Sequence, residues 1–314
     1  MVDGRAAMAY VGKTPWHGLG QELTEGATME TWATESGMDF KVCRSRVRFG
    51  EGDNAKIWDD RHVIFRGDNK APLAVVSKDY QIVQPAQVLS FFNRLCDKHG
   101  FKMETAGTLF NGARYWALAR LPMDFNLGAD KVNAYALLAT SCDGSMSTVG
   151  KITSVRVVCN NTLGLSMSKA GAATVRVRHS SKFDETAVAV DLGLLSGEWE
   201  QFTVRAQRLA ARKLSQFEAV NVLIDAMGDA NKPVDEQPNA RAMAEILKLF
   251  NGAGVGSNLP SADGTAWGLI NAATEFYDHH AGRSDNARLA SSWFGPNGDK
   301  KTAVYDKAMA LLND

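Results

Sequence analysis

The sequence lacks most of the features that mark a catalytic or metal-binding site. Its four cysteines, Cys43, Cys96, Cys142 and Cys159, are far apart and form no C-x-x-C pair, which argues against a zinc knuckle or a redox dithiol. It contains no H-E-x-x-H motif, no G-x-S-x-G motif and no glycine-rich phosphate loop that ends in Lys-Ser/Thr. The case for an enzyme is therefore thin, and we expect neither a metal nor another cofactor.

Long apolar runs and net charge are lacking too. No apolar stretch approaches the length of a membrane span and no signal peptide opens the sequence, so we expect a soluble cytoplasmic protein without membrane contact. The formal net charge is zero. Any attraction for a polyanion must therefore come from local clusters of basic residues.

Acidic residues are absent from one long stretch, residues 144–183. An even distribution of the 35 acidic residues of the chain would place about four of them there. The stretch instead carries six cations, which are Lys151, Arg156, Lys169, Arg176, Arg178 and Lys182. This asymmetry favours a binding surface for an anion.

Two further segments are basic. Arg44, Arg46 and Arg48 alternate along a predicted strand, residues 41–48, and would share one face of it. The predicted helix 201–216 contains no acid and places Arg205, Arg208 and Arg212 along one stripe. Such cations repel one another unless an anion meets them, and phosphate backbone is the commonest such partner. The alternatives are solvated faces, pairing with acids elsewhere in the fold, or a subunit interface.

The order of elements predicts an α+β fold, an antiparallel β-sheet with helices across one face, plus a smaller helical C-terminal region. Strands are expected at residues 41–48, 62–65, 73–76, 101–109, 114–121, 133–141 and 174–179, with a short one after Gly150. Helices are expected at 29–36, 85–100, 155–168, 184–227 with a break near Gly193–Gly197, 241–251 and 265–280, before a short closing element at 291–295. The other face of the sheet would be free, and basic residues would line it or its rim.

We expect three regions along the chain. Residues 1–227 would form the α+β core with a basic groove, residues 228–240 a linker or exposed loop, and residues 241–314 the helical C-terminal region.

Four motifs together resemble a family of phage- and plasmid-encoded proteins that is catalogued as domain of unknown function 932. The motifs are Pro15–Gly20 (PWHGLG), Ser154–Leu163 (SVRVVCNNTL), Trp267–His279 (WGLINAATEFYDH) and Ser291–Gly295 (SSWFG). The resemblance implies a mobile-element setting in a bacterial host cell, but no activity and no functional residues. The architecture is also loosely similar to the single-strand annealing recombinases of phages (the RecT, Red-beta and Erf type), which form rings or filaments.

Our leading hypothesis is a non-catalytic, homo-oligomeric protein that binds single-stranded DNA and anneals complementary strands in phage or plasmid recombination. The basic residues named above would hold phosphates, and Tyr115, Trp116 and Tyr135 would stack on bases unless they are core residues. A phage exonuclease or a host single-strand-binding protein would be a further partner.

Two rival hypotheses remain. The first is a phage or plasmid protein-interaction factor, an anti-defence protein or a replication accessory, that has no nucleic-acid activity and uses its basic surface on an acidic partner. The second is a hydrolase with Cys159 as its nucleophile and His179 as its base, although a cysteine among apolar neighbours is more often a core residue.

Overall fold

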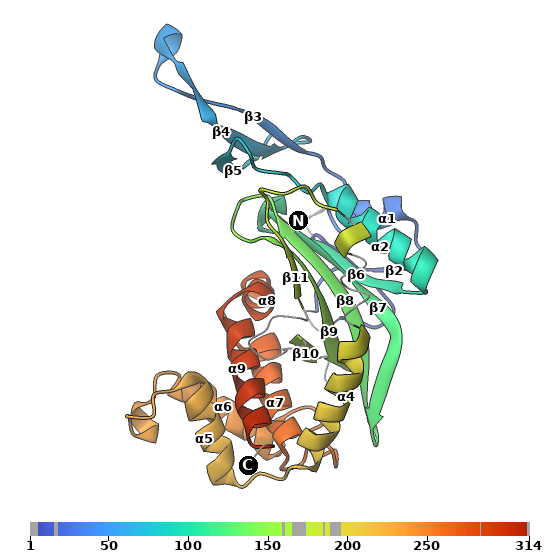
Figure 1. Ribbon diagram of the computed structural model, residues 1–314, viewed down its shortest axis with the longest axis vertical. Coiled ribbons are helices and arrows are strands. Elements are labelled where there is room, and N and C mark those ends of the chain that lie inside the picture. The colour runs from blue at the N-terminus through green and yellow to red at the C-terminus, as the bar shows by residue number, and fades with distance from the viewer. Residues whose placement is uncertain are drawn as a thin grey trace. The chain divides into compact units, whose positions relative to one another are not determined.

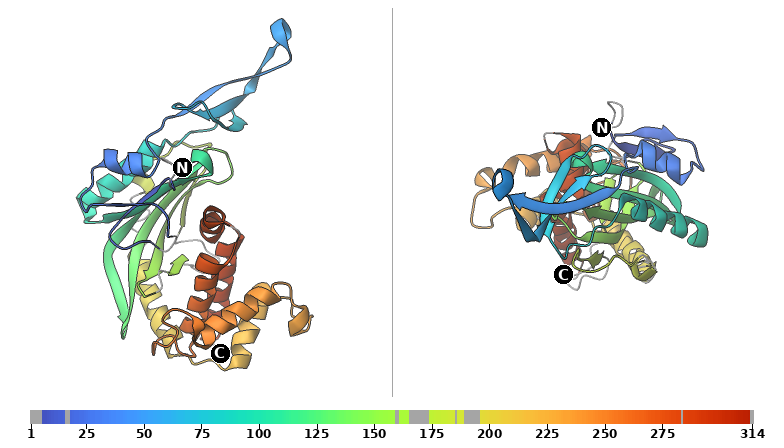
Figure 2. Two further views of the ribbon diagram at one scale, coloured as in Figure 1. Left: turned by 180° about the vertical axis from the view of Figure 1, so that it is seen from behind. Right: turned by 90° about the horizontal axis from the view of Figure 1, so that it is seen from above.

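A computed structural model describes residues 6–15, 18–158, 161–164, 174–184, 186–188, 196–282 and 284–312 (Figures 1 and 2). It confirms the predicted mixture of helices and a curled antiparallel sheet. The chain divides into two compact units. Unit 1 comprises Met1–Pro122, Ala136–Lys151 and Thr174–Leu194, and unit 2 comprises Met123–Tyr135, Ile152–Ala173 and Leu195–Asp314.

The larger sheet has eight strands. They are β1 (Met8–Val11), β2 (Gln21–Leu23), β6 (Lys102–Leu109), β7 (Arg114–Leu127), β8 (Asp130–Ser141), β9 (Thr148–Arg156), β10 (Asn161–Gly164) and β11 (Thr174–Val177). Their order is β10-β9-β8-β7-β6-β1-β2, and β11 also pairs with β9. β1 and β2 are parallel, whereas β1 with β6, β6 with β7, and β9 with both β10 and β11 are antiparallel. β7, β8 and β9 each contribute residues to both units.

The first two helices belong to unit 1: α1 (Met29–Glu35) and α2 (Pro85–His99). α2 shows why local sequence predicted its ends correctly. Pro85 occupies the first helical turn, and Gln84 and Gln87 form a reciprocal capping box. Gly100 ends the helix with φ 67°, a left-handed conformation that favours glycine. The apolar face of α2, which includes the fully buried Phe92, lies in contact with β6.

A second, three-stranded sheet of unit 1 is formed by β3 (Val42–Phe49), β4 (Lys56–Arg66) and β5 (Pro72–Ser77), with a short 3₁₀ turn at Gly52–Asn54 between β3 and β4. β5 pairs only with the second half of β4, residues 61–65. The first half of β4 therefore pairs with β3 alone, and the two strands form a ribbon whose residues 48–60 are all exposed (Figure 1).

The expectation of a free sheet face is wrong for the centre of the larger sheet. Every residue from Ala136 to Cys142 is buried. Because successive residues of a strand point to opposite faces, β8 is covered on both faces here. The basic residues therefore have no open face of β8 to line.

Unit 2 contains the remaining labelled helices. They are α4 (Ser196–Ala211), α5 (Gln216–Met227), α6 (Ala240–Lys248), α7 (Ala266–Glu275), α8 (Asp285–Phe294) and α9 (Pro296–Ala310), with a 3₁₀ turn at Val234–Glu236 and π-helical turns at Leu249–Ala253 and Phe276–His280. All ten residues of α7 are buried, and this helix contacts α4, α6, α9 and β10. The Thr265 side chain caps α7 by accepting a hydrogen bond from the Gly268 amide.

Three sequence expectations need correction in this region. The predicted helix 155–168 is wrong over its described part. Residues 155–156 are the end of β9, and residues 161–164 form β10, which pairs with β9 in antiparallel orientation. The predicted helix 184–227 is interrupted at residues 212–215, and Ser215 caps the new helix α5. The break expected at Gly193–Gly197 lies mostly outside the described residues. The C-terminal helix α9, which begins at Pro296, was not predicted.

The expected boundary after residue 227 does not separate the two units. Residues 195–227 belong to unit 2 together with the loop at 228–239 and the C-terminal helices. Within that loop, Gln237 is buried and its side chain bonds to the Asp229 amide and carbonyl and to the Lys232 carbonyl. The segment is therefore a structured connection inside unit 2.

Candidate functional site

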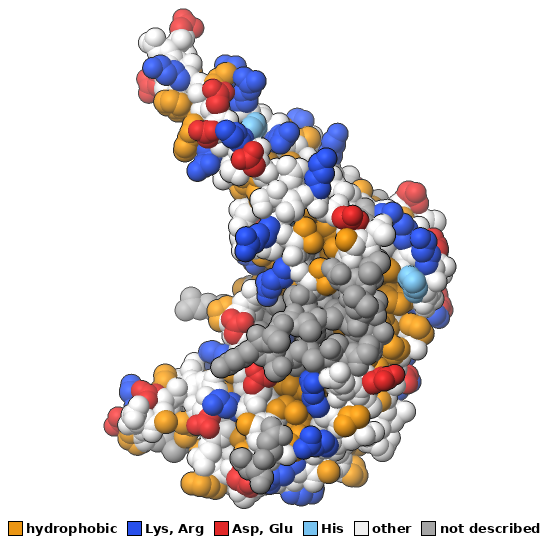
Figure 3. All heavy atoms as spheres, in the orientation of Figure 1, with side chains coloured by type: hydrophobic (Ala, Val, Ile, Leu, Met, Phe, Trp, Pro, Cys, Tyr) orange, Lys and Arg blue, Asp and Glu red, His pale blue; other side chains and the backbone are white. Residues whose placement is uncertain are grey.

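A row of three exposed arginines runs along β3 in unit 1. Arg44, Arg46 and Arg48 alternate along the strand, so their side chains project from one face of the ribbon. Their cross-strand neighbours on β4 are not acidic: Ile64, His62 and Ile57. No other described residue forms a hydrogen bond or ion pair with any of the three guanidinium groups. In Figure 3, basic side chains recur along the β3–β4–β5 sheet, with acidic side chains between them.

Three more exposed cations lie on or just after β11, also in unit 1. Arg176, Arg178 and Lys182 are exposed, and within the described ranges their charged groups have no bonded partner. This segment is held firmly by a neighbour: the His179 carbonyl accepts a hydrogen bond from the Gln81 amide. We call these three residues, together with Arg44, Arg46 and Arg48, the β3/β11 cations.

His179 itself has a structural role. Its Nδ1 lies 3.0 Å from the Gln81 carbonyl oxygen and its Nε2 lies 3.1 Å from the Met146 carbonyl oxygen. Its ring stacks on Tyr80 at 4.5 Å between centroids. These contacts hold His179, just after β11, against the segment that follows β5. Arg178 and Lys182 therefore lie on either side of a residue whose position is fixed.

The arginines that were predicted to form a stripe along α4 bond to groups within unit 2. Arg205 donates to the Gln201 side chain, and Arg208 donates to the Leu312 carbonyl near the C-terminal end of α9, where a cation is favourable. Arg212 forms an ion pair with Glu218 at 2.6 Å. The three side chains therefore serve contacts within this unit.

Glu218 shows how the α4–α5 connection is stabilised. Its carboxylate accepts hydrogen bonds from the Ser215 backbone amide, from Arg212 and from the Ser215 hydroxyl. These contacts, the Ser215 amide above all, lower the pKa of Glu218 to about 2. Ser215 and Glu218 form the capping box that begins α5.

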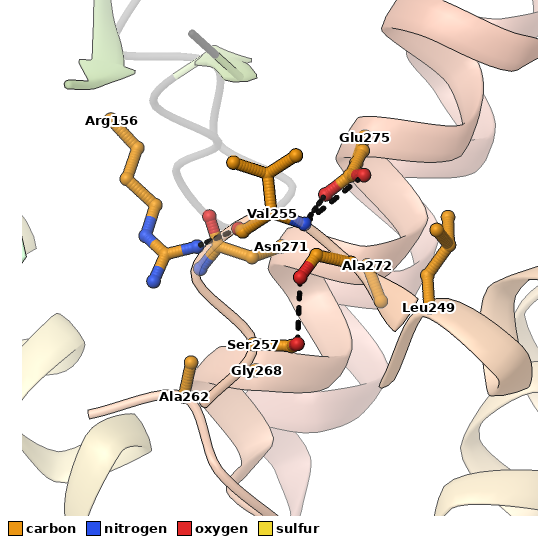
Figure 4. Close-up of a pocket in the computed structure, with 10 residues that line it drawn as sticks. Arg156, Leu249, Val255, Ser257, Ala262, Gly268, Asn271, Ala272 and Glu275 are labelled. Atoms are coloured by element: carbon orange, nitrogen blue, oxygen red, sulfur yellow. Dashed lines mark hydrogen bonds between the residues drawn. The ribbon is translucent and has the colours of Figure 1, made fainter. Parts of the chain in front are cut away.

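Arg156 requires a correction, because it is buried. Its side chain is 3% exposed, and Nε donates to the Asp130 carboxylate at 2.8 Å. One of its other nitrogens donates to the Val255 carbonyl (Figure 4). The remaining one donates to the Gly256 carbonyl. A guanidinium surrounded in this way cannot hold a phosphate, so Arg156 leaves the candidate set.

The two other cations of the acid-free stretch add little. Lys151, at the β9 position opposite Thr174, is half-buried, and Lys169 lies outside the described residues.

Three of the four motifs of the resemblance, all but Pro15–Gly20, contribute residues to two buried polar networks in unit 2. In the first, Asp130 is fully buried and accepts hydrogen bonds from Arg156, from the Ser261 hydroxyl at 2.8 Å and from the Trp267 indole N–H at 3.2 Å. The Asn161 side chain donates to the Asn271 carbonyl at 3.0 Å and links β10 to α7.

The second network centres on Asp278. Its carboxylate accepts from the Thr162 amide at 2.7 Å and the Thr162 hydroxyl at 2.9 Å, and from the Ser292 hydroxyl. Lys301 forms an ion pair with Asp278 at 2.7 Å, and both side chains are buried. The network thus joins β10, the turn after α7, α8 and α9 around one carboxylate.

Both networks connect strands and helices of unit 2 through buried ion pairs. Each ionised group has an opposite charge and hydrogen bonds, which is the condition under which a buried charge is tolerated. A small hollow borders the first network and is lined by Arg156, Asn271 and Glu275, among others (Figure 4). There the Glu275 carboxylate accepts from the Val255 amide at 3.0 Å, so it too is engaged.

The aromatic part of the hypothesis also needs correction. Tyr115, Trp116 and Tyr135 are 0%, 1% and 4% exposed, so they are core residues and cannot stack on bases. The ribbon instead exposes Phe49 and Trp58, which the sequence analysis did not single out. Phe49 directly follows the alternating arginines of the predicted strand, which was an available signal for it, whereas Trp58 has no such signal in the sequence.

The hydrolase hypothesis gains no support in the described part of the chain. Cys159 lies outside it, and the proposed base His179 is committed to the two carbonyl oxygens described above. Burial raises the pKa of the Cys142 thiol to about 12, which keeps it protonated and unreactive. The candidate loop Pro15–Gly20 includes Trp16 and His17, which the structure does not describe.

The described ranges lack both a metal-binding cluster and a membrane-spanning helix. They contain no group of three or more His, Cys, Asp or Glu side chains arranged to hold a metal ion. None of their helices is long and apolar enough to cross a membrane.

Fold and site together define a mixed α and β protein with an exposed β-ribbon that carries a row of arginines in one unit and buried ionic networks in the other. Its residues 72–293, more than half of the chain, match the family model described as Domain of unknown function (DUF932), and the chain belongs to this family. The match includes both buried aspartates but ends before Lys301 and begins after β3 and β4. No curated protein and no solved structure matches the chain.

Proposed function

We propose that this protein binds single-stranded DNA through the β3/β11 cations and anneals complementary strands during phage or plasmid recombination. One observation carries the proposal. Of the predicted basic residues that the structure describes, those in unit 2 (Arg156, Arg205, Arg208 and Arg212) are all bonded to neighbouring groups of that unit. In unit 1, Lys151 is half-buried, whereas the other six are exposed and have no bonded partner among the described residues.

The proposed chemistry is electrostatic and needs no bond making. Each guanidinium or ammonium group would neutralise a phosphate and release a condensed counterion, which supplies the free energy of binding. The guanidinium fork suits phosphate oxygens because it donates two parallel hydrogen bonds. Oligomerisation of the protein would multiply such contacts along one strand.

The experiment is a titration of a fluorescein-labelled single-stranded oligonucleotide by anisotropy over a salt series, with duplex of the same sequence as competitor. If all six β3/β11 cations meet phosphates, log K should fall with log salt with a slope of about −4, at about −0.7 per phosphate on single strands. Preference for the single strand, followed by faster pairing of complementary strands in an annealing assay, would support both parts of the proposal.

A protein-interaction factor is the rival, because the same cations could meet an acidic protein. Absence of binding at near-physiological salt would refute the DNA-binding proposal and leave this rival. Binding without any effect on strand pairing would refute the annealing step alone.

A further inference from the structure

The β3–β4 ribbon exposes the indole ring of Trp58. Trp58 lies in the half of β4 that pairs with β3 alone, and it is 46% exposed. The Arg61 guanidinium lies over the indole, 5.3 Å from the ring centroid. A cation at this distance is attracted to the face of the ring, so Arg61 helps to fix the orientation of Trp58.

The strand pairing places a second aromatic side chain on the same face. Trp58 is opposite Val47, and Phe49 follows two residues later on β3, opposite Lys56. Directly paired residues, and residues two apart, project from one face. Phe49 is 55% exposed. The ribbon thus has an aromatic face, with Phe49 and Trp58, and an arginine face, with Arg44, Arg46 and Arg48.

A β-bulge lies directly beside Trp58. The register with β3 shifts between Arg46 and Val47, which leaves residues 59–61 of β4 unpaired with β3. A bulge increases the local twist and changes the direction in which side chains point. A two-stranded ribbon without a core is only marginally stable in water. Exposed aromatic rings on such a ribbon therefore favour a partner that covers them.

We propose that Trp58, with Phe49 beside it, stacks on unpaired bases of single-stranded DNA while Lys56 and Arg61, which lie next to these rings, hold the neighbouring phosphates. This inference rests on the proposed function and adds to it the reason for a preference for single strands. A base offers an aromatic face to a side chain only when no neighbouring base covers it, and stacking on aromatic side chains tolerates any base sequence.

Charge favours DNA over a protein as the occupant of the aromatic face. Residues 41–66 carry seven Lys or Arg against four Asp or Glu, a net charge of +3 in a chain that is neutral overall. Asp60 is paired with Lys78 at 3.0 Å and Arg66 with Asp68 at 2.7 Å, and because both partners lie outside this range the two pairs leave its net charge unchanged. Lys56 and Arg61 border the two aromatic rings, where a polyanion bound to the ribbon would pass.

The test compares two labelled probes of equal length and charge, an oligothymidylate and a strand with abasic residues in place of thymidine. Trp58→Ala should weaken binding of the oligothymidylate by about 5-fold or more, the range found for loss of one stacked base, and leave binding of the abasic strand unchanged. Trp58→Phe should restore most of the affinity. Phe217→Ala is the matched control, because Phe217 is 74% exposed on α5, in unit 2.

The outcomes separate this inference from the proposed function. Equal binding of both probes by the wild-type protein, or an equal effect of Trp58→Ala on both, overturns stacking but leaves electrostatic binding intact. Failure of the wild-type protein to bind either probe overturns both. Circular dichroism checks that each variant is folded, which is expected because Trp58 is solvent-exposed.

Discussion

Replacing Arg44, Arg46 and Arg48 together by glutamine removes half of the β3/β11 cations with little expected effect on the fold. All three side chains are exposed, and no described residue forms a hydrogen bond or ion pair with them. Their removal therefore leaves no buried group without its partner, so the cost in stability should resemble that of ordinary surface substitutions.

The size of the effect follows from the number of charges. With six phosphates neutralised the salt slope on single strands is about −4, and with three it is about −2. Between 50 and 200 mM salt the wild-type protein should lose about 300-fold in affinity and the triple variant only about 20-fold. The two proteins should differ most at low salt, where screening is weakest.

Anisotropy titrations at four or more salt concentrations measure both slopes. The matched control is the triple variant Lys232→Gln, Arg241→Gln and Lys248→Gln, which removes the same charge from exposed positions of unit 2. Its slope should equal that of the wild-type protein. An unchanged slope in the folded β3 variant would show that these arginines do not meet phosphates, and equal changes in both triple variants would show that only net charge matters.

Two predictions concern stability. Arg156→Ala should lower the free energy of unfolding, measured by urea titration, by about 3–5 kcal/mol, because it leaves the buried Asp130 carboxylate without its charge partner. Adding Asp130→Asn should recover part of this loss. A loss below about 1 kcal/mol would contradict the buried ion pair. The pKa of Glu218 is lowered to about 2 in the folded protein, compared with about 4.3 in the unfolded chain. Its ionised carboxylate therefore stabilises the fold above about pH 4.3, and this stabilisation is lost as the pH falls toward 2. The wild-type protein should therefore melt at a higher temperature than Glu218→Gln at pH 6, and the difference should disappear near pH 2; a constant difference across this range would refute the assignment.

The local sequence predicted several elements well. Pro85 and Gly100 set the two ends of α2, and the alternation at 41–48 predicted β3 (Val42–Phe49) and the shared face of its arginines. These signals are local, because capping, backbone conformation and strand periodicity depend on residues that are near one another in the chain. The β3 part of the candidate site could be predicted for this reason.

Local sequence patterns did not predict burial where the contacts are made by residues far away in the chain. Arg156 and Arg178 belong to the same acid-free stretch and look alike in sequence, yet one is buried against Asp130 and the other is exposed. The partner of Arg156 lies 26 residues away, and nothing in the local sequence shows the pairing. Likewise, Tyr115 and Trp58 both lie in strands, and only their surroundings make one a core residue and the other a surface residue.

The sequence by itself determined some elements, such as α2 and β3, and the places where charge is concentrated, because periodicity, capping and composition are properties of short segments. The tertiary structure decided which of those charges remain available to a ligand. A cation enters a protein interior only with a counter-charge and hydrogen bonds, and their positions are fixed when β9, β10 and the helices of unit 2 fold together. Of the described cations singled out from the sequence, that selection left six exposed without a bonded partner among the described residues, all of them in unit 1, where the proposed interface lies.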